Sequence, residues 1–224
     1  RLALSATIVR HHDEYGTQRL FDYFGDKCIE YTLKQAILDG KLTPYFYYPV
    51  LVSFNEEELH EYVEITDKVA KILKKVPHGD DLPQSAERLL IKRARIIAGA
   101  QEKVTKLKEV IAPYRNDNHL LVYCGATRVE STFKNEAGVD GDEQRQIDEV
   151  TALLGNSLGM RVTQFTAAED SKQRELIKDK FSNGEIQALV AIKCLDEGMN
   201  IPGIETAFIL ASSTNPKEYI QRRG

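Results

Sequence analysis

The chain has 224 residues and a formal net charge of -4, and it is long enough to bury a hydrophobic core without disulfide or metal support. Hydrophobic residues make up 42% of it, and no run approaches the roughly 18 to 20 consecutive apolar residues of a membrane span, so we expect a soluble globular protein with no membrane role. The net charge gives no overall attraction to phosphate backbones, so any nucleic-acid contact has to come from a local basic surface or from sequence outside this chain.

Cysteine usage favours a reducing compartment. Cys28, Cys124 and Cys194 lie far apart without CxxC spacing, which predicts reduced and mostly buried thiols, a cytoplasmic protein and no metal site. The run His11–Glu14 contains ligand-type residues, but consecutive positions point different ways, so we interpret it as a polar loop. The chain begins without Met and ends after a basic run, and we expect both ends to be cuts in a longer protein.

The first fifty residues contain two strand-like and two helix-like patterns. Residues 2–8 form an apolar run ending in small hydroxyl residues, as in a buried parallel strand. Residues 17–25 and 32–38 have helical spacing, the second behind Thr32 as a cap. Residues 45–53 are rich in aromatic and β-branched side chains and predict a strand, with a proline that favours a sheet edge.

The next segment predicts a helical insertion. A charged helix covers 56–73, a loop follows at 77–83, and a long helix runs from about Ala86 to Ile111. The apolar stripe of that helix comprises Leu90, Ala94, Ile97, Val104 and Ile111. Its opposite face carries a basic stripe that suits a DNA backbone or, as charged helix faces usually are, is simply solvated: Arg88, Lys92 and Arg95.

The second half alternates apolar runs with helical segments. The predicted strands are 120–124, 161–165, 187–192 and 206–210, and helices at about 141–155 and 169–182 fill the two larger gaps. This alternation predicts an α/β fold with a parallel sheet covered on both faces. In such sheets the functional residues lie at the carboxyl ends of the strands.

Segments at those strand ends resemble, in order and spacing, the conserved motifs of superfamily 2 helicases. Leu4–Thr7 is similar to the motif that ends the family's first RecA-like lobe, and Leu121–Cys124 to its fourth motif. Ala188–Pro202 is similar to the fifth motif, and Ser213–Gly224 to the sixth, the arginine-finger motif. The segment from Tyr31 to Ile96 resembles the XPB-like and restriction-enzyme-like branch, which translocates on DNA.

The resemblance implies a three-layer RecA-like lobe of the P-loop NTPase type, with a mainly parallel sheet and a helical insertion at about 55–113. Residues 1–40 would be the end of the first motor lobe plus a linker, and 41–224 the C-terminal lobe. The intact protein would be an ATP-dependent DNA helicase or translocase, with RNA as a possible alternative track. ATP and Mg²⁺ would be held mainly by the missing first lobe, so this chain alone should be inactive.

The resemblance also assigns roles to residues. Arg222 and Arg223 are the catalytic candidates, because a guanidinium group on a helix that starts at Thr214–Pro216 can stabilise charge on a transferring γ-phosphoryl. The family's second finger would follow Gly224. The expected ATP contacts are Glu197, Gly198, Asn200 and Gln221. The expected nucleic-acid contacts are Thr127, Arg128, Thr166, Lys193 and Cys194. The residues expected to couple the lobes are Ser5, Ala6 and Thr7.

Several alternatives stay open or are rejected on the sequence. Asn200 and Ile192 replace the family's usual Asp and Thr, which favours, as an alternative, a degenerate non-catalytic lobe that binds DNA or protein. Arg128 could equally belong to an ordinary turn and cap. Asp196–Glu197 superficially resembles a Walker B pair, but the chain has no GxxxxGK[ST] loop, and it has no GxGxxG for a Rossmann oxidoreductase.

Overall fold

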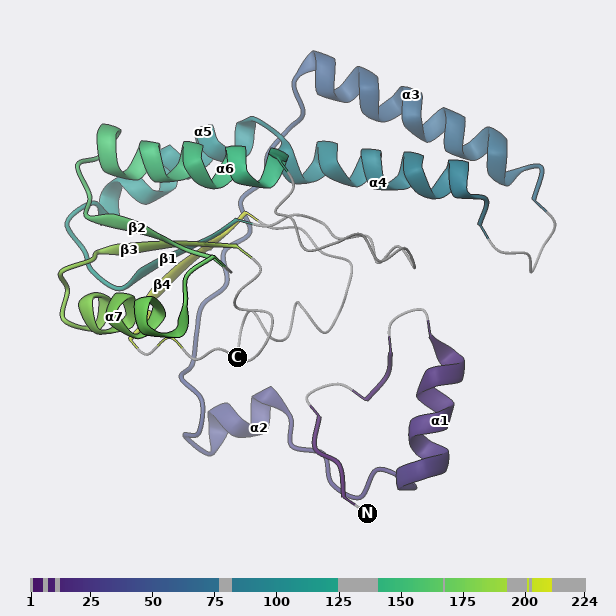
Figure 1. Ribbon diagram of the computed structural model, residues 1–224, viewed down its shortest axis with the longest axis horizontal. Coiled ribbons are helices and arrows are strands. Elements are labelled where there is room, and N and C mark those ends of the chain that lie inside the picture. Colours follow the sequence, from purple (N-terminus) through teal and green to yellow (C-terminus); the bar gives the residue numbers. More distant parts are fainter. Residues whose placement is uncertain are drawn as a thin grey trace. The chain divides into compact units, whose positions relative to one another are not determined.

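The computed structural model describes residues 2–5, 8–10, 13–76, 82–124, 141–166, 168–192, 201 and 203–210, with only the backbone for 141–145. The described residues divide into two compact units, one ending at Pro49 and the other beginning at Val50. Figure 1 shows the order of the elements along the chain. Each unit is described by itself below.

The N-terminal unit contains the two predicted helices. Helix α1 spans Glu14–Phe24, and the side chain of Asp13 caps it by accepting a hydrogen bond from the Gly16 N–H at 2.7 Å. Helix α2 spans Leu33–Leu38 behind a capping box in which Thr32 and Gln35 satisfy each other's backbone N–H. Residues 2–5 form no strand, so the described part of the first predicted strand is wrong.

The predicted strand at 45–53 is also wrong. Residues 43–55 are described but form neither helix nor strand, and the Phe46 and Leu51 side chains are 88% and 89% exposed. Strand preference measures how well a side chain fits a pleated, half-buried surface, so it forms no strand without a partner. No described strand pairs with this segment, and Pro49 lacks the N–H that a ladder would use.

The described residues of the helical insertion form helices α3, α4 and α5. Helix α3 spans Glu56–Leu73, as expected, and lies beside helix α4, which spans Gln84–Gly99 (Figure 1). The long helix expected from Ala86 to Ile111 is wrong as a single element, because α4 ends and helix α5 begins again at Glu102–Ile111. Ala100 has φ -50° and ψ 122°, an extended conformation that breaks the helix although the apolar stripe continues through it. A short 3₁₀ turn η1, Ala112–Tyr114, follows α5.

The C-terminal half forms the expected parallel sheet. Its strands are β1 (Leu120–Cys124), β2 (Val162–Phe165), β3 (Ala188–Ile192) and β4 (Thr206–Ile209), in the order β2-β3-β1-β4. All three pairings are parallel. Helix α6 (Gly141–Ala152) continues into a π-helical turn η2 (Leu153–Ser157), and helix α7 spans Ser171–Ser182. The strand predictions are therefore confirmed to within one residue at each end.

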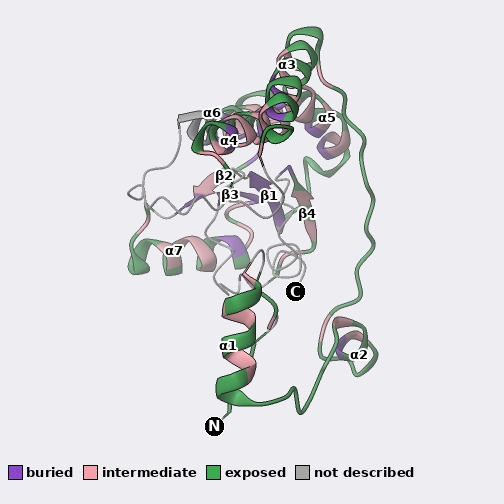
Figure 2. Cartoon of the chain, turned by 90° about the vertical axis from the view of Figure 1, so that its right-hand side faces the viewer, coloured by how far each residue is buried: buried purple, intermediate pink, exposed green. Residues whose placement is uncertain are grey.

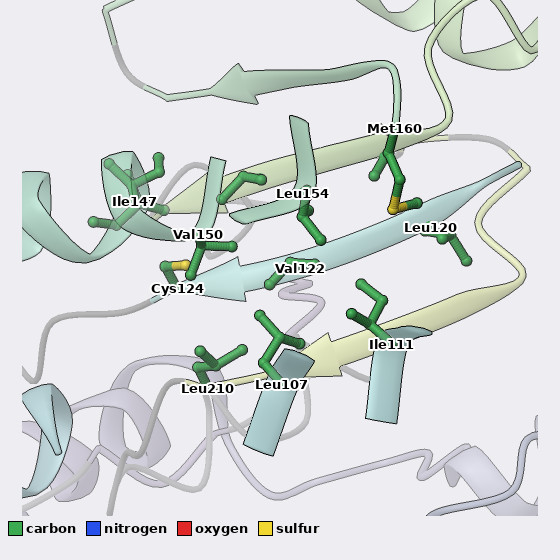
Figure 3. Close-up of a cluster of buried hydrophobic side chains, with 13 residues drawn as sticks. Leu107, Ile111, Leu120, Val122, Cys124, Ile147, Val150, Leu154, Met160 and Leu210 are labelled. Carbon is green, nitrogen blue, oxygen red and sulfur yellow. The ribbon is translucent and has the colours of Figure 1, made fainter. Parts of the chain in front are cut away.

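Helices cover both faces of this sheet, which confirms the predicted three-layer α/β class. Helices α5 and α6 pack on one face and α7 on the other (Figure 1). The alternating side chains of β1 divide accordingly: Val122 joins the α5–α6 core shown in Figure 3, and Tyr123 joins the α7 core. Strands β1 and β3 are buried along their whole length (Figure 2), which explains why both are continuous apolar runs in the sequence.

Candidate functional site

The carboxyl edge of the sheet brings four segments of the chain together. Because the four strands in the described residues are parallel, they end at this one edge, at Cys124, Phe165, Ile192 and Ile209. Cys124 and Ile192 are register partners in the two central strands. The fourth-motif segment Leu121–Cys124 and the first part of the fifth-motif segment, Ala188–Ile192, therefore end at neighbouring positions of the sheet.

Most of the predicted site residues follow those strand ends and lie outside the described residues. They are Ala6, Thr7, Thr127, Arg128, Lys193, Cys194, Glu197, Gly198, Asn200, Gln221, Arg222 and Arg223. Their roles stay predictions. Ser5 and Thr166 are the predicted site residues that the structure describes. Ser5 is exposed in the N-terminal unit.

Thr166 is held in a compact polar turn at the end of β2. Its backbone N–H donates to Glu169 Oε2 at 2.6 Å and its hydroxyl donates to the same carboxylate at 3.0 Å. The hydroxyl also accepts from the Ala168 N–H at 3.1 Å, and the Thr166 carbonyl accepts from Arg174 Nη2 at 3.1 Å. With 7% of its surface exposed, Thr166 is mostly buried, and its hydroxyl is engaged within the chain. The carboxylate of Glu169 fixes the backbone at this strand end.

A groove of about 600 Å³ lies beside β2 and that turn. Polar and apolar side chains line it: Thr151, Val162, Thr163, Gln164, Ala168, Glu169, Gln173, Leu176 and Ile177. Gln164 Nε2 donates to Asp148 Oδ1 at 2.8 Å and to Thr151 Oγ1 at 3.3 Å, which ties the groove's strand wall to α6.

A lysine from the helical insertion reaches the carboxyl end of β4, the strand at the other side of the sheet from β2. Lys103, in the first turn of α5, donates from Nζ to the carbonyl of Ala98 at 3.2 Å and to that of Leu210 at 3.0 Å. Leu210 directly follows β4, and its N–H donates to the Tyr123 carbonyl at 2.9 Å. Burial lowers the pKa of Lys103 to about 8, because desolvation penalises the charged ammonium.

Hydrogen bonds from α6 and from the start of α3 also hold the end of α4. The buried side chain of Gln146, on α6, donates from Nε2 to the Ala98 carbonyl at 3.1 Å. The N–H of Gln101 donates to Glu58 Oε1 at 2.9 Å, and Asn55 Nδ2 donates to Gln101 Oε1 at 3.3 Å. The α3–α4 hairpin therefore starts and finishes at one hydrogen-bonded base.

The basic stripe of α4 is exposed, but part of its charge is balanced by α3. Arg88, Lys92 and Arg95 all face solvent. Lys92 Nζ lies 2.7 Å from Glu61 Oε1, and this hydrogen-bonded carboxylate raises the pKa of Lys92. Arg93, the neighbouring cation, lies over the ring of Tyr62 at 5.7 Å. Phosphate binding by the stripe stays a prediction.

The thiols and the polar run near the N-terminus differ in part from expectation. Cys124 is buried, and desolvation raises the pKa of its thiol to about 12, whereas Cys28 is exposed, so the expectation of burial is wrong for that cysteine.

In the polar run near the N-terminus, Asp13 caps α1 and forms an ion pair with Arg10 at 2.7 Å. Within the described ranges, no cluster of three or more His, Cys, Asp or Glu side chains could hold a metal ion. No helix in that same part of the chain is long and apolar enough to cross a membrane.

Sequence reasoning missed Lys103, Gln146 and Glu169. Lys103 interrupts an apolar helical face next to Val104, which is the only local sign of its burial. Gln146 carries no such sign. Glu169 lies three residues after a strand-terminal threonine, a spacing that suits a turn closed by side-chain hydrogen bonds.

Comparisons with known proteins agree with this architecture. The family model described as "Helicase conserved C-terminal domain" matches residues 102–224, more than half of the chain. A curated relative, "DNA 3'-5' translocase XPB2" from Sulfurisphaera tokodaii, is 22% identical over an alignment that covers the whole chain and 48% of the relative. The chain thus spans about half the length of the curated relative that it matches.

Solved structures give more distant matches. The Sulfolobus solfataricus SWI2/SNF2 ATPase C-terminal domain matches at 13% identity and a TM-score of 0.47, over 75% of this chain and 80% of that one. The Pyrococcus furiosus Hef helicase domain matches at 18% identity and a TM-score of 0.37, over 75% of this chain and 35% of that one.

Proposed function

Because the chain belongs to the helicase conserved C-terminal domain family, we propose that it is the C-terminal half of an ATP-driven DNA helicase or translocase motor of superfamily 2. The observation that carries this proposal is the parallel sheet whose two central strands, β1 and β3, end as register partners at Cys124 and Ile192. The fourth and fifth motifs of the resemblance stand at these strand ends. The groups that would contact nucleic acid and nucleotide thus leave the sheet together.

Nucleotide chemistry in this proposal is shared with a first lobe. The C-terminal lobe would contribute Arg222 and Arg223 toward the γ-phosphoryl, and Glu197, Gly198, Asn200 and Gln221 toward the rest of the nucleotide. ATP and Mg²⁺ would be held mainly by the first lobe, since no GxxxxGK[ST] loop occurs in this chain. Residues 1–40 would be the end of that first lobe with its linker, and Ser5, Ala6 and Thr7 would couple the lobes.

DNA is the proposed track, because the relative with the matching sequence is named a DNA translocase. Thr127, Arg128, Lys193 and Cys194, which follow the ends of β1 and β3, would contact its backbone. Thr166 is the fifth proposed contact, and because its hydroxyl and N–H are bonded to Glu169 and its carbonyl to Arg174, DNA would compete with these bonds there. A helicase with this substrate would act in the cytoplasm or on the nucleoid, with the first lobe and DNA as its partners.

The experiment is an ATPase assay of the intact protein, with and without DNA. Arg222→Ala should lower the DNA-stimulated kcat by roughly 10³-fold or more, as arginine fingers supply this much in related phosphoryl transfer. Arg115→Ala is the matched control, because Arg115 lies outside all the motifs. In its turn the backbone N–H of Arg115 donates to the Ala112 carbonyl, and the substitution keeps that bond. Unchanged turnover in Arg222→Ala would refute the finger role.

The 224-residue chain provides the second test. It should show no DNA-stimulated ATPase activity, because the proposed phosphate loop lies in the other lobe. Robust activity from this chain alone would contradict the division of labour between the lobes. An intact protein that binds DNA without hydrolysing ATP would instead support the degenerate lobe.

A further inference from the structure

Strand β4 is less buried than the two central strands of the sheet. Among the described strands it lies at an edge and pairs with β1 alone, and it alternates between half-buried and exposed residues, whereas β1 and β3 are buried throughout. The chain leaves β4 through Leu210 and then enters the segment that carries the arginine motif. Whatever fixes Leu210 therefore fixes the point from which that motif departs.

Two hydrogen bonds fix the backbone of Leu210. Its N–H donates to the Tyr123 carbonyl at 2.9 Å, which extends the β1–β4 pairing by one residue. Its carbonyl accepts from Lys103 Nζ at 3.0 Å. The Leu210 side chain is also buried in the same core as Leu107 of α5, and Figure 3 labels both residues. Helix α5 thus holds this strand end by a hydrogen bond from Lys103 and through the core that both elements share.

The same ammonium group also holds the helical hairpin. Lys103 Nζ lies 3.2 Å from the carbonyl of Ala98, in the last turn of α4, where helix carbonyls have no intrahelical partner. A single side chain therefore joins the base of the α3–α4 hairpin to the edge strand of the sheet. Gln146 contacts the same Ala98 carbonyl from α6 but is not bonded to Leu210.

We propose that Lys103 is a positioning residue that braces the end of β4 against the base of the α3–α4 hairpin and thereby aims the arginine-bearing segment at the nucleotide. The proposal rests on the proposed function for its effect on ATP turnover. Misplacing a catalytic group by about 1 Å can cost on the order of 10²-fold in rate, so a contact that never touches ATP can still set kcat. Through this lysine, force on the hairpin would reach the phosphoryl-transfer site.

The test compares two variants of the intact protein. Lys103→Met keeps the length of the side chain but removes the donor to both carbonyls. Gln146→Met is the matched control, because it removes a buried donor to the Ala98 carbonyl while leaving the bond to Leu210 in place. Both changes put an uncharged side chain of similar size in place of a polar one, so both variants should fold.

The first measurement is hydrogen exchange of peptides that cover 206–212. Lys103→Met should raise their exchange by about tenfold relative to wild type, since local opening follows the loss of local hydrogen bonds. Peptides that cover 162–165, on the opposite edge of the sheet, should be unchanged. Gln146→Met should leave both sets within about twofold of wild type.

The second measurement is steady-state ATP hydrolysis with saturating DNA. Lys103→Met should lower kcat by about tenfold or more with a KM for ATP within about twofold, the pattern of a group that acts only in the transition state. Equal effects of the two variants would overturn the proposal, as would faster exchange at β4 without any change in kcat. If the wild-type protein hydrolyses no ATP, the proposed function fails, and unchanged exchange at 206–212 would separately refute the brace.

Discussion

Replacing Phe181 tests the packing of α7 against the sheet. Its side chain is fully buried near the end of α7, in the core that includes Tyr123, Phe165 and Leu189. The ring also meets the His119 imidazole edge-on, with ring centroids 5.5 Å apart and planes at 69°. Phe181→Ala would remove all of these contacts and leave a cavity between helix and sheet.

The expected loss follows from the buried ring. Truncation of a fully buried phenylalanine costs about 3–5 kcal/mol, which combines the lost transfer free energy with the cavity left behind. The better helix propensity of alanine returns only about 0.5 kcal/mol. Since domains of this kind are stable by roughly 5–15 kcal/mol, the variant should remain folded but lose a large part of its stability.

Urea unfolding followed by far-ultraviolet circular dichroism measures this loss. With a slope of about 2 kcal/mol per molar urea, the midpoint of the transition that reports the sheet should fall by roughly 2 M. Leu176→Ala is the matched control, because Leu176 lies on the same helix but is 55% exposed, and its truncation should cost less than about 1 kcal/mol. A loss for Phe181→Ala below about 1 kcal/mol, or equal to that of the control, would refute the packing of α7.

Three further predictions concern a cap, a thiol and a buried amine. Asp170→Ala should destabilise the protein by about 1 kcal/mol in the same urea assay, because Asp170 accepts the Gln173 N–H at the start of α7, whereas Asp170→Asn should be nearly neutral. Iodoacetamide at neutral pH should modify Cys28 in the native protein and leave Cys124 unmodified until urea unfolds the chain, because burial keeps the Cys124 thiol protonated with a pKa of about 12; labelling of both at equal rates, read by peptide mass spectrometry, would contradict this. Burial lowers the pKa of Lys103 from 10.5 to about 8, so between these values the unfolded chain binds more protons than the native one. Relative to Lys103→Met, the wild-type free energy of unfolding should therefore rise by up to roughly 3 kcal/mol as the pH increases from about 8 to 10.5, and a difference that stays constant or shrinks would refute the burial of the ammonium.

The candidate site could be located from the sequence only as far as the ends of strands. A parallel sheet forces Cys124, Phe165, Ile192 and Ile209 to one edge, and this edge could be predicted because the strand positions could be. The hydrogen-bond partners at the edge could not. Glu169 engages the hydroxyl of Thr166, a local contact that a three-residue spacing permits but does not require.

The sequence by itself determined the elements whose pattern matches their burial. Strands β1 and β3 are continuous apolar runs because both faces of each are covered, and α2 and α3 begin at capping boxes that lie within four residues of sequence. The motif order likewise belongs to the sequence, and it sufficed to identify the family before any contact was known. These features depend on neighbouring residues alone, so they can be inferred without the fold.

Only the tertiary structure decided which local sequence patterns form a strand or a single helix. The aromatic segment 45–53 has every local property of a strand and forms none, because no described strand offers it a ladder. The apolar stripe of residues 86–111 continues through the break at Ala100, so periodicity could not reveal two helices. Lys103 meets Leu210 across 107 positions of sequence, a contact made by the packing of α5 beside the sheet and by nothing near either residue in the chain.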